Sequence, residues 1–290
     1  MDLGEKVVLI TGCSSGVGMH AAVQLAQQGA RVYASMRNPA KAGALQALAG
    51  EAAVEVSVLT LDVQNDESVR AAVALVESEA GHIDVLINNA GFGSVRTLEQ
   101  ATPEQLSEIM DVNFFGVTRC IRAVLPGMRG RKSGRIVTVS SVGGLVGQPL
   151  NEIYCAAKFA LEGLIESMAT YMEPFFNIRM TLIEPAGIRT EFVNRVMADL
   201  QTEAAPLQEV YGPVLGAYIG QIQKRGAFES SAQTAAQVAE VIVHSLQDES
   251  SGLRTLTSPA AKAFVMEKIQ GDPDGSELQG RIRRDLLGVG

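Results

Sequence analysis

The side chains best suited to proton transfer in this sequence are Ser141, Tyr154 and Lys158. Tyr154 and Lys158 stand four residues apart, so on a helix they share one face. A free phenol has a pKa of about 10. A lysine cation beside the phenol favours the phenolate and is expected to lower that pKa. Because the hydroxyl of Ser141 can hold a carbonyl or alcohol oxygen against the phenol, the three residues are predicted to move a proton on and off an oxygen atom.

A dinucleotide site that can supply a hydride is predicted in the first forty residues. The apolar run 7–10 predicts a buried strand, a glycine-rich turn follows at 11–18, and an amphipathic helix then runs to Gln28. In this order the elements form the first unit of a dinucleotide-binding fold, with the pyrophosphate facing the helix N-terminus. The residues predicted to bind the cofactor here are Gly12, Ser14, Ser15, Gly16, Val17 and Gly18.

The end of the second predicted strand, at Met36 and Arg37, indicates which dinucleotide is used. An acidic residue about 20 positions past the glycines would bind the ribose 2′-hydroxyl of NAD and would repel a 2′-phosphate. A guanidinium can instead pair with that phosphate. The alternative is that Arg37 is an ordinary solvated arginine before a helix start at Asn38 and Pro39. The sequence favours NADP(H) over NAD(H).

Five separated motifs resemble those of the classical short-chain dehydrogenases/reductases in order and spacing, over roughly residues 5 to 192. They are Thr11–Gly18, Asn88–Gly91, Asn113, Ser141, and Tyr154 with Lys158. Within that family, the stretches 13–16, 111–113, 141–145 and 154–163 look like the subgroup of 17β-hydroxysteroid and photoreceptor-type retinol dehydrogenases. Ala186 departs from the pattern, since many relatives carry glycine there.

The resemblance implies a role for each matched residue. Tyr154 would be the general acid/base, and Lys158 would lower its pKa and bind the nicotinamide ribose. Ser141 would orient the substrate oxygen, and Asn113 would hold a water in a proton relay through Lys158. Further cofactor contacts are implied at Asp62, Val63, Asn89, Ala90, Gly91, Pro185, Gly187, Ile188 and Thr190.

Three of these residues also have plainer interpretations. Asp62, which would meet the adenine, could be a turn residue at a strand end. Asn113 could mark a kink in a long helix. Thr190, which would contact the carboxamide, could be a helix cap. Their cofactor and relay roles depend on the resemblance.

Strands and helices alternate regularly along the chain. Strands are predicted at 7–11, 31–36, 54–61, 84–88, 135–140, 178–184 and 253–257. Helices are predicted between them, one of them opened by a capping box at Thr102–Gln105. The pattern predicts an α/β fold of the Rossmann type, a doubly wound parallel sheet in a single domain over residues 1–270. A polar tail follows at 271–290, either a mobile end or a partial lid.

Residues 186–230 interrupt this alternation with an apolar insertion that shows partly helical spacing. The family resemblance implies that this helical substrate-binding insertion covers the active site. Its apolar side chains, together with Val142, Leu145 and Leu150 on the catalytic loop, predict a hydrophobic substrate such as a steroid, a retinoid or another bulky ketone.

The composition bounds the class of protein. The 290 residues are 47% apolar and 19% charged, which is typical of a soluble globular protein, and the net charge of −8 argues against a nucleic-acid partner. No apolar run approaches 18 residues, so no integral membrane segment is expected, and a strand starting at Val7 leaves no room for a signal peptide. The three cysteines are odd in number and lack metal-site spacing, which predicts reduced thiols in a cytoplasmic protein without a metal site.

The sequence therefore predicts an NADP(H)-dependent oxidoreductase that interconverts a hydrophobic ketone and a secondary alcohol. One alternative is reduction of 3-oxoacyl thioesters, which would need a basic docking surface beside the crevice. Another is a non-catalytic dinucleotide-binding sensor or scaffold, which would not need to keep the catalytic residues together. The resemblance also implies a homodimer or homotetramer paired through the helices around 104–128 and 154–172. The apolar stripe on the second helix, at Leu161, Leu164, Ile165 and Met168, could instead face the sheet.

Overall fold

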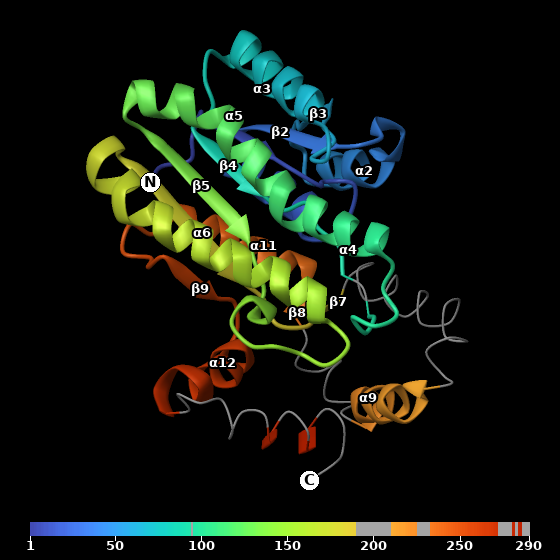
Figure 1. Ribbon diagram of the computed structural model, residues 1–290. Coiled ribbons are helices and arrows are strands. Elements are labelled where there is room, and N and C mark those ends of the chain that lie inside the picture. The colour runs from blue at the N-terminus through green and yellow to red at the C-terminus, as the bar shows by residue number, and fades with distance from the viewer. Residues whose placement is uncertain (94, 190–209, 225–232, 272–279, 282–283, 286–290) are drawn as a thin grey trace.

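A seven-stranded parallel sheet in the order β3-β2-β1-β4-β5-β6-β9 forms the centre of the molecule (Figure 1). The computed structural model describes residues 1–93, 95–189, 210–224, 233–271, 280–281 and 284–285. The strands are β1 (Val7–Ile10), β2 (Arg31–Met36), β3 (Ser57–Thr60), β4 (Val85–Asn88), β5 (Gly134–Val139), β6 (Ile178–Glu184) and β9 (Arg254–Leu256). The strand order reverses between β1 and β4, which confirms the predicted doubly wound fold.

Helices cover both faces of the sheet, so its strands are apolar on both sides. Helices α3 (Asp66–Ala80), α5 (Gly116–Arg131) and α6 (Glu152–Phe176) lie on one face, and α1 (Gly16–Gln27) and α11 (Ala235–Gln247) pack on the other (Figure 1). Along β1, Val8 and Ile10 join the core under α1 and α11, whereas Val7 and Leu9 join the core under α3 and α5. Burial on both sides explains why the strand reads as a continuous apolar run.

The long helix predicted before β5 is divided. Helix α4 (Pro103–Met110) begins with the predicted capping box at Thr102, and α5 begins at Gly116. Between them lies η2 (Asp111–Phe115), one turn of π-helix. Such turns often occur at functional sites, and this one contains Asn113.

The remaining described elements are short or peripheral. They are η1 (Pro39–Lys41), α2 (Gly43–Glu51), η3 (Val142–Gly144), β7 (Ile188–Arg189), α9 (Gly212–Lys224), β8 (Gln233–Thr234) and α12 (Pro259–Gly271). The pairing of β7 with β8 is a second small sheet that the sequence pattern did not predict, because two-residue strands carry no periodicity.

The predicted insertion at 186–230 is described only in part, since 190–209 and 225–230 lie outside the described residues. The part that is described includes α9, whose Leu215 is buried against Val95 and Leu150. Most of the predicted tail at 271–290 also lies outside the described residues. Among the helices that the structure describes, none has the length and apolar character needed to span a membrane.

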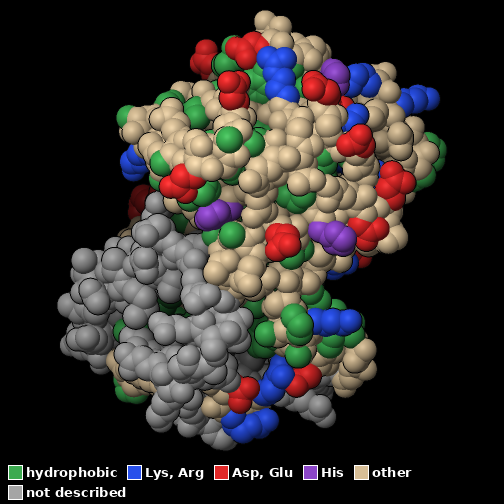
Figure 2. All heavy atoms as spheres, turned by 180° about the vertical axis from the view of Figure 1, so that it is seen from behind, with side chains coloured by type: hydrophobic (Ala, Val, Ile, Leu, Met, Phe, Trp, Pro, Cys, Tyr) green, Lys and Arg blue, Asp and Glu red, His purple; other side chains and the backbone are tan. Residues whose placement is uncertain are grey.

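Charged side chains of both signs lie on the surface. Figure 2 shows acidic and basic side chains scattered among one another over the described part of the rear face.

The three cysteines, Cys13, Cys120 and Cys155, are unpaired and buried. Cys13 lies within the glycine-rich turn, where burial raises the pKa of its thiol. This favours the inert thiol over the reactive thiolate.

Candidate active site

A ligand crevice is expected at the switch point of such a sheet, and β1 and β4 end side by side there. The Thr11 hydroxyl accepts hydrogen bonds from the backbone N–H groups of Asn89 and Ala90, both at 3.0 Å. In return, Nδ2 of Asn89 donates to the carbonyls of Thr11 at 2.9 Å and Gly12 at 3.0 Å. These contacts fix two predicted cofactor segments against each other. The structural role of Thr11 escaped the sequence analysis, because nothing in the glycine pattern shows what lies across the crevice.

Two glycines of the turn are required by this close approach. Gly12 has φ +75°, and a Cβ there would lie 2.8 Å from the Cα of Ala90. A Cβ on Gly18 would lie 2.4 Å from Nδ2 of Asn89. The side chain of Ser15 does not cap α1, so the first amides of that helix suit a phosphate group. The turn therefore fits a dinucleotide pyrophosphate.

The residues at the end of β2 are those from which a preference for a phosphorylated ribose was predicted. Met36 is buried, and Arg37 is exposed immediately past the strand, at the carboxyl edge of the sheet. An exposed guanidinium at this edge is available to a 2′-phosphate.

Ser141, Tyr154 and Lys158 are brought together at the carboxyl end of β5. Ser141 caps η3, and its hydroxyl accepts a hydrogen bond from the N–H of Gly143 at 3.0 Å. Tyr154 and Lys158 project from the first turns of α6, and a hydrogen bond joins Tyr154 to Ser141. The Nζ of Lys158 lies 5.8 Å from the centre of the Tyr154 ring and donates to the carbonyl of Val139 at 2.9 Å.

The titration of the phenol differs from the prediction. Burial raises the pKa of Tyr154 to about 12, although the hydrogen bond with Ser141 opposes the shift. Burial also lowers the pKa of Lys158 to about 8, against the pull of Glu162. The prediction of a lowered phenol pKa is therefore wrong for this arrangement, because desolvation of the phenolate is the largest effect on it. At neutral pH Tyr154 is a protonated phenol, the form that donates a proton.

Asn113 lies beside this trio and is fully buried. Its Oδ1 accepts from the N–H of Phe92 at 3.0 Å, and its Nδ2 donates to the carbonyl of Phe92 at 2.8 Å. A Cβ on Gly91 would lie 2.6 Å from Oδ1 of Asn113 and 3.8 Å from Nζ of Lys158. The turn of π-helix η2, called the π-turn below, therefore places Asn113 close to the loop after β4 and to Lys158.

The model of the short chain dehydrogenase family matches residues 6–201. The chain belongs to the short-chain dehydrogenase family.

The most similar proteins include two curated relatives. Retinol dehydrogenase 8 of Bos taurus is 39% identical over 284 residues, covering 93% of this chain and 87% of its own length. The 17-beta-hydroxysteroid dehydrogenase type 1 of Homo sapiens is 36% identical over 297 residues, covering 99% of this chain and 87% of its own length. These relatives confirm the predicted subgroup.

A solved structure supports the fold and the class of cofactor. The short-chain dehydrogenase/reductase from Burkholderia phymatum in complex with NAD has a TM-score of 0.78 and 25% identity, covering 96% of each chain. Members of this family bind NAD or NADP.

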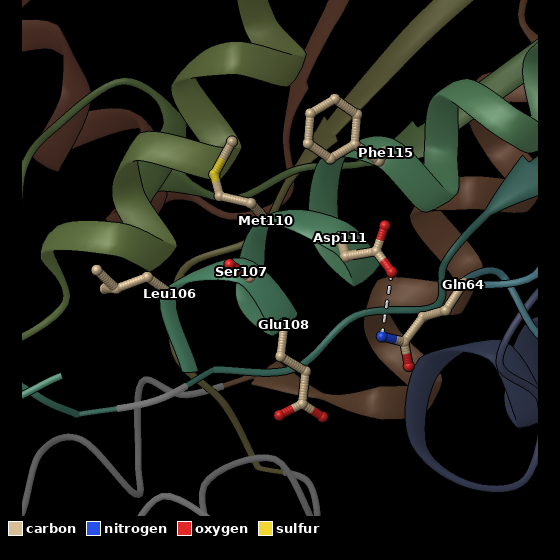
Figure 3. A pocket seen from close by; sticks show the side chains of 7 residues that line it. All are labelled: Gln64, Leu106, Ser107, Glu108, Met110, Asp111 and Phe115. Atoms are coloured by element: carbon tan, nitrogen blue, oxygen red, sulfur yellow. Dashed lines mark hydrogen bonds between the residues drawn. The ribbon is translucent and has the colours of Figure 1, made fainter. Parts of the chain in front are cut away.

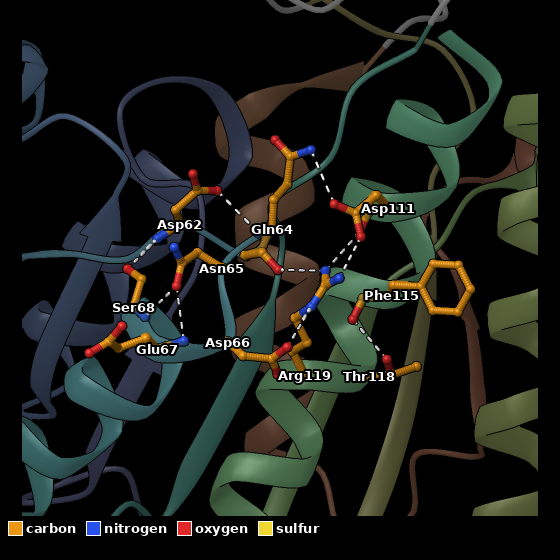
Figure 4. Close-up of polar contacts among 11 residues, drawn as sticks. Asp62, Gln64, Asn65, Asp66, Glu67, Ser68, Asp111, Phe115, Thr118 and Arg119 are labelled. Carbon is orange, nitrogen blue, oxygen red and sulfur yellow. Dashed lines mark hydrogen bonds and ion pairs between the residues drawn. The ribbon is translucent and has the colours of Figure 1, made fainter. Parts of the chain in front are cut away.

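Arg119 of α5 holds the loop that was predicted to meet the adenine (Figure 4). Its Nη2 contacts Oδ1 of Asp111 at 2.6 Å, and its Nη1 donates to the carbonyl of Val63 at 3.0 Å. Gln64 donates to the other oxygen of Asp111 at 3.2 Å. The guanidinium thus joins the Asp62–Val63 loop, predicted to meet the adenine, to the π-turn that carries Asn113.

A hollow on the outer side of this region is lined by α4 and the π-turn (Figure 3). Its lining residues are Gln64, Leu106, Ser107, Glu108, Met110, Asp111 and Phe115. It includes none of Ser141, Tyr154, Lys158 and Asn113, so it is separate from the predicted catalytic residues.

The predicted nicotinamide side is partly described. The carbonyl of Pro185 accepts a hydrogen bond from the N–H of Val142 at 3.0 Å, which ties this segment to the catalytic loop. Gly187 and Ile188 follow and are partly buried. Thr190, the last predicted contact, lies outside the described residues.

Proposed function

We propose that this chain is an NADP(H)-dependent oxidoreductase that interconverts a hydrophobic ketone and a secondary alcohol. The observation that carries the proposal is the meeting of Ser141, Tyr154 and Lys158 beside Asn113, at the carboxyl edge of a sheet whose glycine turn fits a dinucleotide. The sensor or scaffold alternative needs no such grouping of proton-transfer groups. The named activities of the relatives, on retinol and on 17β-hydroxysteroids, support a substrate of this class.

A bound nicotinamide dinucleotide would exchange the hydride with the substrate carbon. The chain's residues handle the oxygen. Ser141 orients the carbonyl oxygen, and Tyr154 donates its phenolic proton as that oxygen gains negative charge. Lys158 keeps a positive charge nearby, which stabilises the phenolate that remains. Oxidation of the alcohol uses the same groups in reverse.

The Tyr154→Phe variant tests this reaction. Removal of the phenolic proton should lower kcat by about 10²–10⁴-fold, the usual contribution of a general acid. The cofactor affinity should change little, because the ring and its packing remain. Tyr171→Phe is the matched control, since Tyr171 lies on the same helix and is exposed. Turnover by Tyr154→Phe within a few-fold of wild type would refute the proposed acid.

The preference for NADP(H) rests on Arg37 and on the absence of a carboxylate at Met36. The Met36→Asp variant should shift the ratio of kcat/KM toward NADH, because the new carboxylate repels a 2′-phosphate. The ratio is measured with both cofactors in both proteins. A wild-type protein that prefers NADH would contradict this part of the proposal, and the NAD-bound structural neighbour makes that comparison informative.

A buried apolar cluster that includes Leu150 of the catalytic loop supports a bulky, apolar substrate. Val95, Leu150 and Leu215 are buried together, and Tyr211, Val214 and Tyr218 pack against them. Steroid, retinoid, aryl-ketone and 3-oxoacyl panels should be compared with a short ketone in an NADPH-oxidation assay. Each buried methylene contributes about 0.8 kcal/mol, so a multi-ring ketone should be preferred by orders of magnitude. Equal efficiency toward short and large ketones would contradict an apolar substrate site.

We also propose a cytoplasmic homo-oligomer. The buried stripe at Leu161 and Ile165 does not support this, because both side chains pack against the sheet. The exposed aromatic side chains Phe115, Phe159, Tyr171 and Phe175 on η2 and α6 do support it. Light scattering at micromolar concentration should give at least twice the monomer mass.

A further inference from the structure

A cluster of charged side chains connects three arms of the site. Glu162 of α6 accepts a hydrogen bond from the Ser140 hydroxyl at 2.5 Å and another from Nε of Arg254 at 2.9 Å. The same Nε lies 3.4 Å from Oε1 of Glu184, the last residue of β6. The cluster is tightly packed, because a Cβ on Gly144 would lie 3.0 Å from Cγ of Glu162.

Three of the four members, all but Arg254, are covalently next to, or one helical turn from, a residue of the proposed site. Ser140 precedes Ser141, and Glu162 follows Lys158 by one helical turn. Glu184 directly precedes the Pro185 segment. A change in the cluster can therefore reach the catalytic loop, the helix of the proton donor and the cofactor segment together.

The surroundings of Glu184 disfavour its ionised form. Its side chain is fully buried, and among the described residues none donates a hydrogen bond to either oxygen. An ionised carboxylate without donors is strongly disfavoured, and a second carboxylate beside it adds repulsion. A proton placed on Glu184 supplies the missing hydrogen bond, since the two carboxyl groups lie within bonding reach of each other.

We propose that Glu184 is a positioning residue whose carboxyl group is protonated at neutral pH and donates a hydrogen bond to the carboxylate of Glu162. The shared hydrogen bond holds the catalytic loop, α6 and the Pro185 segment in one arrangement. Its importance for turnover rests on the function proposed above, but the bond itself and its effect on the cofactor segment do not.

The charges around Glu184 set the direction of the pH dependence. They are Glu162 on α6, with Lys158 and Glu166 one turn to either side, and Arg254 on β9, and just past β5 Ser140 adds an uncharged hydroxyl. Burial and Glu162 raise the pKa of Glu184 to about 8, and Arg254 opposes the shift. An unfolded glutamate has a pKa of about 4.3. The stability that the proton gives is therefore complete below that value and is lost as the pH rises through about 8.

The Glu184→Gln variant tests this, because an amide keeps a hydrogen-bond donor that cannot be titrated. Glu166→Gln is the matched control. Glu166 lies on α6, the helix of Glu162, and contacts Arg254 at 2.6 Å, but its side chain is 59% exposed. Thermal unfolding is measured from pH 5 to pH 9. Over the same range the affinity is measured for NADPH or NADH, whichever cofactor binds more tightly. Neither measurement needs a substrate, so a failure of the proposed reaction leaves both tests in place.

The thermal unfolding midpoint of the Glu184→Gln variant should match that of the wild type near pH 5 and should exceed it by about 3 °C or more at pH 8–9. The ratio of variant to wild-type cofactor affinity should rise several-fold over the same interval. Glu166→Gln should run parallel to wild type in both measurements. Parallel unfolding curves for Glu184→Gln would overturn the shared proton, and diverging unfolding with parallel affinities would overturn the positioning role. Should Glu184→Gln fail to fold, the infrared band of a protonated carboxyl must be present in the wild type at pH 7 and vanish by pH 9, and its absence would refute the proposal.

Discussion

Two arginines flank the crevice, and their surroundings differ in charge. Arg119, on the side predicted to hold the adenosine, contacts two aspartates and the carbonyl of Val63. Arg254, on the side predicted to hold the nicotinamide, contacts three glutamates, of which Glu162 and Glu184 are buried. The first is a clamp between two loops. The second has more carboxyl groups than one guanidinium can neutralise.

The difference shows what each arrangement can do. Around Arg119, the half-buried Asp111 also receives a hydrogen bond from Gln64, so the clamp is fully paired without a shared proton. Around Arg254, one proton in place of a second cation completes the pairing. A paired clamp fixes geometry, whereas an arrangement that needs a proton fixes geometry only while the proton is present.

Removal of the nicotinamide-side arginine should have the larger effect. The Arg254→Met variant removes the cation that contacts both Glu162 and Glu184, and breaking a buried ion pair in this way costs about 3–5 kcal/mol. The loss should be greater at pH 8 than at pH 5, because Arg254 lowers the pKa of Glu184 and its removal makes ionisation still harder. Chemical denaturation at the two pH values measures both effects. A loss that is independent of pH would remove the distinction between the two arginines.

Removal of the adenosine-side arginine should have an intermediate effect. In Arg119→Met the carbonyl of Val63 and the carboxylate of Asp111 lose a charged donor, which costs about 1–3 kcal/mol. Cofactor affinity should fall because the Asp62–Val63 loop is no longer tied to the π-turn. Arg119→Lys keeps the charge without the planar fork and should recover only part of the affinity. Full recovery by lysine would show that charge alone matters, which would weaken the description of a clamp.

The smallest effect is expected for the exposed acids at the edges of the two clusters. Asp66 lies 3.6 Å from Nε of Arg119 with a side chain that is 62% exposed. Surface ion pairs of this kind contribute about 0–1 kcal/mol. Asp66→Asn should therefore leave activity unchanged and shift stability slightly, measured at low and high salt. A loss as large as that of Arg119→Met would mean that Asp66, and not the loop carbonyl, is the important partner.

The elements that the sequence predicted well are those with a local signal. All seven main strands were predicted, because β-branched runs between turn residues need no distant partner to be recognised. β3 differed most, starting at Ser57 instead of residue 54. The site residues were predicted through motif order and resemblance, and the structure places Ser141, Tyr154, Lys158 and Asn113 close together.

The sequence missed features that depend on distant residues. Glu184 and Arg254 lie on two strands and carry no motif, and Glu162 received no role although it lies inside the matched stretch 154–163. Nothing in the sequence distinguished Arg119 from an ordinary helix residue, although its guanidinium donates a hydrogen bond to Val63, 56 residues away in sequence. The direction of the Tyr154 pKa was wrong because spacing shows the nearby lysine but not the depth of burial.

By itself, the sequence determined the order of strands and helices, the glycine turn, the separation of Tyr154 from Lys158 and thus the class of reaction, because these are encoded in residue type and short-range spacing. The tertiary structure decided how the groups titrate and what holds them. Burial sets the cost of each charge, and burial follows from which chain segments pack together. The proton that we assign to Glu184 is a product of that packing, and no local pattern contains it.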